Sequence, residues 1–292
     1  MMAGRSTSVP VISSSLRGWR AVFIGVDGTG DADGATYGRE MGNSFISQIH
    51  RACIEPSGRK HYLRGPTLWG REVRAIARQV VALVLNGSQV GDHRICLAGY
   101  SRGGAAVIVA SQLMDAELRR RGHEIEALFL FDAVDRDAFT DSSIIPGCVA
   151  RTYHAIRSGV VGSRGYFGNA ATATTGGLLE EKWFTGTHSA LGGLPWAGDH
   201  PDPYIDWKTP RQAGSNPSRI GGRLFGDLGA RQGRGVQLGL SPSFLNDPAL
   251  TVRRGSEPIT TAPLGFRKID DVDAMRHVRN WMWPLLVKHK IV

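Results

Sequence analysis

A serine flanked by two glycines is the residue of this sequence best placed to act as a nucleophile. Ser101 stands in the pattern G-x-S-x-G, with Gly99 and Gly103 on either side. Where a strand turns sharply into a helix, glycines at these two positions prevent clashes around a strained serine. The turn lifts the hydroxyl above the edge of the sheet, and the N-terminus of the helix offers N–H groups to an oxyanion. The pattern therefore predicts attack of Ser101 on a carbonyl carbon.

The stretches on both sides of Ser101 have the character that such a turn requires. Residues 94–100 form a short apolar run, which is typical of a buried strand. Residues 102–121 have an apolar first half and a basic end, which is typical of a helix whose dipole favours cations at its C-terminus. An ordinary glycine-rich turn is the alternative, but the position between a strand and a helix favours the nucleophile.

A serine nucleophile needs a base, and after such a turn the chain order is serine, acid, histidine. His188 lies in the loop "GTHSALGG", behind a strand candidate at 179–186, and we predict that it is the base. His154 lies in the middle of the strand-like "RTYHAIR" and is interpreted as a packed core histidine. His277 lies within a helical pattern and is the alternative base.

The acid is expected at the same edge of the sheet as the serine. Asp132 directly follows the strand candidate 125–131, so we choose it as the acid, with Asp135 in reserve. The more usual site is one strand later, after residues 149–156, but the "RSGVVGSRG" that follows there has no carboxylate. The alternative is that Asp132 only caps its loop.

The oxyanion is expected to meet two backbone N–H groups. One belongs to Arg102, which follows the serine, and the other to Gly28 or Thr29 in the loop after the strand candidate 20–26. Asp27 is expected to brace that loop through hydrogen bonds to backbone N–H groups.

The acidic stretch "TGDADGATYGRE" after the first strand has a second interpretation. It matches a calcium-binding EF-hand loop at Asp31, Asp33, Gly34 and Glu40. Its first position is Thr29 instead of aspartate, and a strand precedes it where an EF-hand has a helix. We therefore interpret the stretch as a solvated acidic loop, and we expect neither a metal ion nor a cofactor.

The periodicity of the chain places these residues in one α/β domain, residues 20–292. Strand-like runs alternate with helical patterns at 70–86, 102–121 and 271–289. Strands that alternate with helices and are nearly continuous in apolar character indicate a mostly parallel sheet with helices on both faces. The pattern is lost at residues 197–265, which we interpret as an irregular cap or excursion over the sheet.

The composition is that of a globular chain with an excess of positive charge. The 292 residues are 41% hydrophobic and carry a formal net charge of +9. This charge favours contact with an anionic membrane surface. The basic residues are dispersed except at 119–121, and we expect no nucleic-acid partner. No run approaches the ~18 consecutive apolar residues of a membrane-spanning helix.

Cysteine usage and the N-terminus bear on the compartment. Cys53, Cys96 and Cys148 are an odd number at wide spacing, which predicts neither a disulfide framework nor a zinc site. Residues 1–19 are interpreted as a flexible lead-in without the apolar segment of a Sec signal peptide. We expect synthesis in the cytoplasm and, for an exported protein, a route other than Sec.

The assembled residues resemble one α/β-hydrolase domain family, which includes bacterial type VI secretion phospholipase effectors. The stretches that carry the resemblance are "FIGVDGTGD", "YLRGP", "GDHRICLAGYSRGG" and "EKWFTGTHSALGG", in this order within residues 20–195. The resemblance implies that Ser101 is the nucleophile and His188 the base. Two features depart from the family. Ala190 stands where the family has an aspartate, and "HAI" at 154–156 is followed by "RSG" where the family often has an acidic pair.

This resemblance implies a serine hydrolase that cleaves a carboxylic ester, most simply a lipid or phospholipid ester, through an acyl-enzyme. Two alternatives stay open. A small-molecule carboxylesterase would use the same chemistry on a soluble ester. A catalytically inactive hydrolase fold would instead serve as a basic binding module for nucleic acid or a protein partner.

Overall fold

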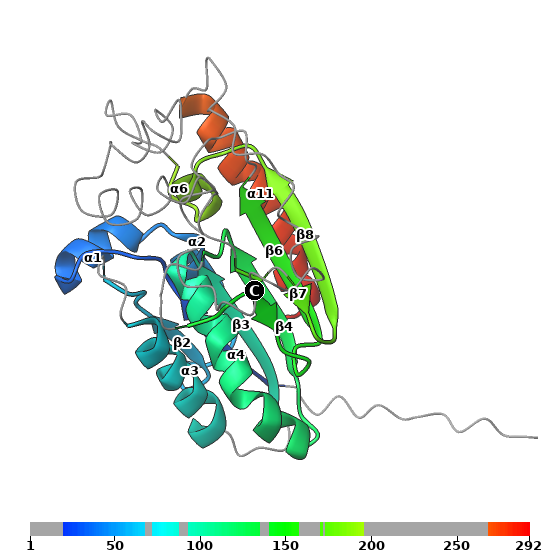
Figure 1. The fold of residues 1–292 in the computed structure, drawn as a ribbon. Coiled ribbons are helices and arrows are strands. Elements are labelled where there is room, and N and C mark those ends of the chain that lie inside the picture. Colours follow the sequence, from blue (N-terminus) through cyan, green and yellow to red (C-terminus); the bar gives the residue numbers. More distant parts are fainter. Residues whose placement is uncertain are drawn as a thin grey trace, which may run out of the picture.

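The structure, a computed structural model, is built around a six-stranded parallel sheet (Figure 1). Neighbouring strands follow the order β2-β1-β3-β4-β6-β8. The strands of this sheet are β1 (Arg20–Val26), β2 (Lys60–Leu63), β3 (His93–Tyr100), β4 (Ile125–Phe131), β6 (Arg151–Arg157) and β8 (Leu178–Phe184). Two short strands form a separate parallel pair, β5 (Ile144–Ile145) and β7 (Ala173–Thr174).

The structure describes residues 20–67, 72–87, 93–134, 140–157, 170–171, 173–195 and 268–292. Three predictions lie outside these residues: the lead-in at 1–19, the cap at 197–265 and the reserve acid Asp135.

Helices cover both faces of the sheet (Figure 1). They are α1 (Gly34–Met41), α2 (Phe45–Ala52), α3 (Val73–Gly87), α4 (Arg102–Arg120), α6 (His188–Leu191) and α11 (Lys268–Lys288). Successive side chains of a strand point to opposite faces. In β1, Val22 and Ile24 pack in one buried cluster with α3 and α4, whereas Ala21 and Phe23 pack in another with α1, α2 and α11. The predicted α/β class, a mostly parallel sheet with helices on both faces, is confirmed.

The strands and helices predicted from periodicity agree with the structure to within a few residues. The strand predicted at 149–156 is Arg151–Arg157, and the helix predicted at 70–86 is Val73–Gly87. The sequence pattern does not predict α1, α2 or β2, which have eight, eight and four residues. Elements of this length contain too few turns or alternations for a periodic signal.

Helix α1 corrects the interpretation of the acidic stretch as a solvated loop. The helix begins within that stretch because the Asp33 carboxylate accepts a hydrogen bond from the Thr36 N–H at 2.7 Å, as an N-cap. The Glu40 carboxylate, the last match to a calcium loop, accepts from the Asp31 N–H at 3.2 Å. Within the described part of the chain, no three His, Cys, Asp or Glu side chains are grouped to hold a metal ion.

The C-terminal helix α11 is fastened to the sheet along its length and at its end. Val278 and Met282 lie in the buried cluster with α1 and α2. Beyond the last turn, His289 Nε2 lies 3.1 Å from Tyr153 Oη, and His289 Nδ1 lies 2.6 Å from Glu126 Oε1. These contacts hold the second half of α11 against the sheet.

Two further features are plain from the described residues. Cys53, Cys96 and Cys148 are all buried free thiols. None of the described helices combines the length and the apolar character that a membrane span requires.

Candidate active site

Ser101 occupies the turn between β3 and α4 in a strained backbone conformation. Its φ of 56° and ψ of −130° are rare for a residue with a side chain. The hydroxyl does not cap α4. The flanking glycines are required for space: a Cβ at Gly103 would lie 2.2 Å from the Asp27 carbonyl oxygen, and one at Gly99 would lie 2.6 Å from Gly104 Cα. The backbone can therefore hold the serine at this turn only because both neighbours lack a side chain.

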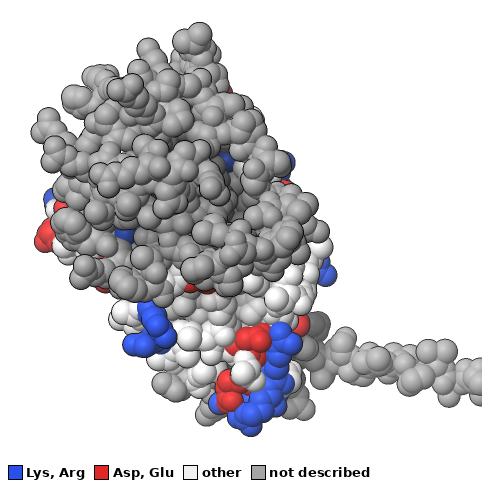
Figure 2. Space-filling view, in the orientation of Figure 1, with Lys and Arg blue, Asp and Glu red and all other residues white. Residues whose placement is uncertain are grey.

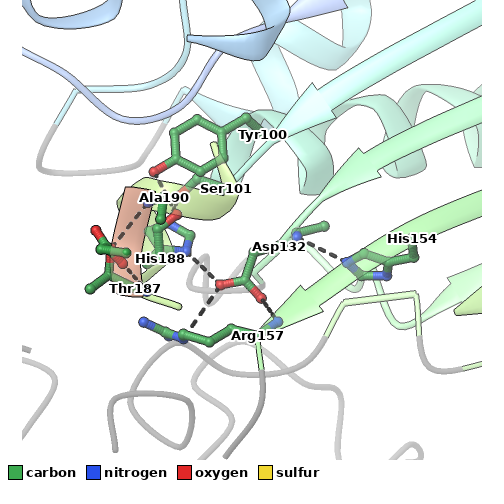
Figure 3. A network of polar contacts seen from close by, with 10 residues as sticks. Tyr100, Ser101, Asp132, His154, Arg157, Thr187, His188 and Ala190 are labelled. Carbon is green, nitrogen blue, oxygen red and sulfur yellow. Dashed lines mark hydrogen bonds and ion pairs between the residues drawn. The ribbon is translucent and has the colours of Figure 1, made fainter. Parts of the chain in front are cut away.

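Ser101, His188 and Asp132 form a continuous chain of hydrogen bonds (Figure 3). His188 Nε2 lies 2.8 Å from Ser101 Oγ, and His188 Nδ1 lies 2.7 Å from Asp132 Oδ2. Asp132 is fully buried, and His188 and Ser101 are 8% and 6% exposed. The structure thus brings together the predicted nucleophile, base and acid.

The pairing of neighbouring strands explains why the serine and the acid meet. Strands β3 and β4 run in parallel and end at the same edge of the sheet. The Ser101 N–H donates to the Phe131 carbonyl at 3.1 Å, and the Val134 N–H donates back to the Ser101 carbonyl at 3.2 Å. The Asp132 N–H donates to the Ala155 carbonyl at the end of β6, at 2.7 Å. These bonds fix the two side chains beside each other.

Arg157 stands at the end of β6, beside the more usual position of the acid, where this sequence has no carboxylate. Its N–H donates to Asp132 Oδ1 at 3.0 Å, and its Nε lies 3.7 Å from Asp132 Oδ2. Both side chains are fully buried. The residue at the usual acid position therefore supports an acid that the neighbouring strand supplies. Sequence reasoning missed it, although its place at a strand end was the available signal.

His154 and His277, the two other histidines considered from the sequence, have different surroundings. His154 is fully buried in β6, as predicted, and its Nε2 accepts a hydrogen bond from the Ala133 N–H at 3.0 Å (Figure 3). It thereby holds the residue that follows Asp132. His277 is exposed on α11. Neither histidine belongs to the hydrogen-bonded chain of Ser101, His188 and Asp132.

The loop after β1 lies against Ser101 but differs in one point from the prediction. A Cβ at Gly28 would lie 3.4 Å from Ser101 Cβ, so the two residues are neighbours. The Gly28 N–H donates to Asp27 Oδ1 at 2.8 Å. This corrects the expectation that Gly28 donates to an oxyanion, and it leaves Thr29 and Arg102 as the predicted donors. The Arg102 Nε–H donates to Thr29 Oγ1 at 2.7 Å and joins the start of α4 to the loop after β1.

Asp27 holds that loop from a fully buried position. Besides the Gly28 N–H, its carboxylate accepts hydrogen bonds from the Ser44 hydroxyl and from the Tyr62 hydroxyl, the latter at 2.8 Å. The Tyr37 hydroxyl donates to the Gly28 carbonyl at 2.7 Å. Burial raises the pKa of Asp27 from its ordinary 3.8 to about 6, although the three donors favour the ionised form. The predicted brace is present and includes two hydroxyl groups that the sequence did not reveal.

The basic run at 119–121 lies at the far end of α4 from Ser101. Nineteen residues of helix span about 28 Å. Its guanidinium groups are paired with acids of the same helix, Arg119 with Asp115, and Arg120 and Arg121 with Glu117. On the face drawn in Figure 2, basic and acidic side chains likewise lie next to one another. This run is therefore not an uncompensated basic patch beside the candidate site.

The strand order, the strand–turn–helix at Ser101 and the chain order serine, aspartate, histidine define an α/β-hydrolase fold. No family model and no curated protein matches the chain.

Several solved structures are similar to this chain at low identity. A cutinase-like protein from Cryptococcus sp. has 19% identity and a TM-score of 0.28, over 44% of this chain and 59% of that one. An uncharacterized protein from Pseudomonas aeruginosa has 13% identity and a TM-score of 0.41, over 89% of this chain and 51% of that one. The thioesterase RedJ of the prodiginine biosynthetic pathway in Streptomyces coelicolor has 14% identity and a TM-score of 0.31, over 72% and 86%. The chain thus spans little more than half of the first two proteins.

Proposed function

We propose that this protein is a serine hydrolase that cleaves a carboxylic ester through an acyl-enzyme. The observation that carries the proposal is the hydrogen-bonded chain from Ser101 through His188 to Asp132. His188 Nε2 takes the hydroxyl proton as Ser101 Oγ attacks the ester carbonyl carbon. Asp132 holds the Nδ1–H and stabilises the imidazolium that forms.

The remaining steps use the same groups. The oxyanion of the tetrahedral intermediate would meet the N–H groups of Arg102 and Thr29. His188 then gives its proton to the leaving alkoxide as the C–O bond breaks, which leaves the acyl group on Ser101. Water, deprotonated by His188, attacks the acyl carbon and releases the carboxylic acid and the free serine.

For the substrate we propose a lipid ester, with a phospholipid at an anionic membrane surface as the specific case. The net charge of +9 and the resemblance to phospholipase effector domains support this choice. The basic run at 119–121 does not support it, because its charges are paired and lie far from Ser101. Export by a route other than Sec is part of the same proposal.

Covalent labelling with a fluorophosphonate probe tests the reaction class. Wild-type protein is expected to carry one adduct on Ser101, located by mass spectrometry, and Ser101→Ala is expected to carry none. Ser111→Ala is the matched control, since Ser111 is a buried serine of α4 whose hydroxyl donates to the Val107 carbonyl. We expect it to be labelled like wild type. A folded wild-type protein without an adduct would favour the inactive binding module.

A comparison of soluble and membrane-bound esters distinguishes a phospholipid hydrolase from a small-molecule carboxylesterase. Short-chain nitrophenyl esters in solution are compared with vesicles of phosphatidylglycerol and of phosphatidylcholine. The proposal predicts release of fatty acid and lysophospholipid, faster from the anionic vesicles. Turnover of the soluble ester with none on either vesicle would identify a small-molecule carboxylesterase. For any accepted ester, Ser101→Ala should lower kcat by about 10⁴-fold or more.

A further inference from the structure

A second polar network lies behind His188 and connects it to the C-terminal helix. The Asp271 carboxylate, in the first turn of α11, accepts hydrogen bonds from the N–H of Thr187 at 2.7 Å and from its hydroxyl at 2.9 Å. Both residues are fully buried. Thr187 directly precedes His188, whereas Asp271 is 84 positions away in the sequence and beyond the region of family resemblance.

Asp271 determines the direction of the Thr187 hydroxyl. A threonine hydroxyl has one donor and two acceptor positions. Because its proton goes to Asp271, its lone pairs are left for the Ala190 N–H, which donates to it at 3.1 Å. Thr187 thereby becomes the N-cap of α6, the four-residue helix that starts with His188. So short a helix is not stable by itself, and its placement depends on these contacts.

The segment before His188 also touches α11 directly. A Cβ at Gly186 would lie 2.4 Å from Ala274 Cβ, so the loop rests on the helix with no side chain between them. From the other side, the Tyr100 hydroxyl donates to the His188 carbonyl at 3.2 Å, and the two rings lie 5.0 Å apart. His188 is therefore held between the end of β3 and the start of α11.

We infer that Asp271 is a positioning residue which, through Thr187, fixes the imidazole of His188 within the hydrogen-bonded chain. The inference rests on the proposed function of that chain. His188 follows β8, which lies three strand positions across the sheet from β3 and Ser101. The loop after β8 and the short helix α6 must therefore bring the imidazole back to the serine. Asp271 holds this loop in place through its two hydrogen bonds to Thr187. A role confined to stability would change the folded fraction and leave the activity of folded molecules intact.

Three variants of the full chain and one matched control test this inference. Asp271→Asn keeps the size of the side chain and removes one acceptor, Thr187→Val removes the hydroxyl at nearly constant shape, and Thr187→Ser keeps the hydroxyl. The control Asp273→Asn changes an exposed carboxylate of the same helix, which is paired with Arg276 at 2.9 Å. Measurements are the rate of fluorophosphonate labelling, kcat and KM on a soluble nitrophenyl ester, and the melting temperature.

The expected result is a loss in kcat without a matching change in KM. Asp271→Asn and Thr187→Val should lower kcat and the labelling rate by about 10- to 100-fold, since a misplacement of about 1 Å has this effect. KM should change by less than about twofold, because ester binding is not altered. Thr187→Ser should recover most of the loss, and Asp273→Asn should match wild type. Equal labelling of wild type and both deleterious variants, per folded molecule, would overturn the inference.

One further readout keeps the inference separate from the proposed function. The proton NMR signal of the His188 Nδ1–H, which faces Asp132, should be present in wild type and lost or shifted in Asp271→Asn, whether or not the probe reacts. If wild type is not labelled, the proposed function fails, and an unchanged signal in the variant would overturn the inference as well. If Asp271→Asn does not fold, the comparison of Thr187→Val with Thr187→Ser decides.

Discussion

The buried carboxyl of Asp27 is expected to make the stability of this protein depend on pH with a sign opposite to that of most carboxylates. Asp27→Asn replaces the group with a neutral one of similar size. In the wild type, burial raises the pKa of Asp27 from 3.8 to about 6. Between these values the unfolded chain has released the proton while the folded protein still binds it. Stability from this group is therefore present below pH 3.8 and is lost as the pH rises through about 6.

The size of the effect follows from the two pKa values. At about 1.4 kcal/mol per pKa unit, the rise from 3.8 to about 6 corresponds to about 3 kcal/mol. Because the unfolded Asp27 is already partly ionised at about pH 4, the free energy of unfolding of Asp27→Asn, minus that of wild type, should increase by about 2 kcal/mol between about pH 4 and about pH 7. Any constant difference in packing or hydrogen bonding cancels from this change.

Urea unfolding followed by circular dichroism, at intervals from about pH 4 to about pH 8, measures both free energies. Asp33→Asn is the control. The Thr36 N–H lowers the pKa of the exposed Asp33 from its ordinary 3.8, so this group is ionised in both the folded and the unfolded state over nearly all of the range, and the difference for Asp33→Asn should stay nearly constant. A difference for Asp27→Asn that stays constant to within about 0.5 kcal/mol over the range would refute the reasoning.

Three further substitutions test the packing around the candidate site. Gly103→Ala is expected to prevent normal folding, because its Cβ would lie 2.2 Å from the Asp27 carbonyl oxygen; a wild-type melting temperature would contradict this. His154→Phe should lower the free energy of unfolding by about 1 to 3 kcal/mol in urea titrations, because the buried Ala133 N–H loses its acceptor. Leu97→Ala should lower it by about 2 to 5 kcal/mol, since the side chain is fully buried, and a change below about 1 kcal/mol would show that the core collapses into the cavity.

Much of the secondary structure of this protein could be predicted from local sequence patterns. The sequence pattern predicted five of the six strands of the sheet. For β1, β3 and β4 the signal was an almost continuous apolar run, as expected for a strand that is buried on both faces. The residues Ser101 and His188 were found from their neighbours, a turn pattern and a loop after a strand. Elements of four to eight residues, such as β2 and α1, were missed, since they are too short to show a period.

The choice of acid and the support of the base could not be predicted in the same way. Asp132 was chosen for its place after a strand, but only the tertiary structure shows that the parallel pairing of β3 with β4 puts it beside Ser101 and that its carboxylate meets His188. Nothing local distinguishes Asp271 from the neighbouring Asp273, and only one of them reaches Thr187. A buried carboxylate is defined by the donors around it, and those donors come from distant segments.

The sequence by itself determined where strands end and where a serine could sit at a strained turn, because both depend on residues next to one another. The tertiary structure alone decided which distant groups share each carboxylate. Asp27 accepts hydrogen bonds from the hydroxyls of Ser44 and Tyr62, and Asp132 binds the imidazole of His188 and the backbone N–H of Arg157. The physical reason is that hydrogen bonds reach only about 3 Å. Their partners are therefore set by how strands and helices pack, and no spacing along the chain encodes that directly.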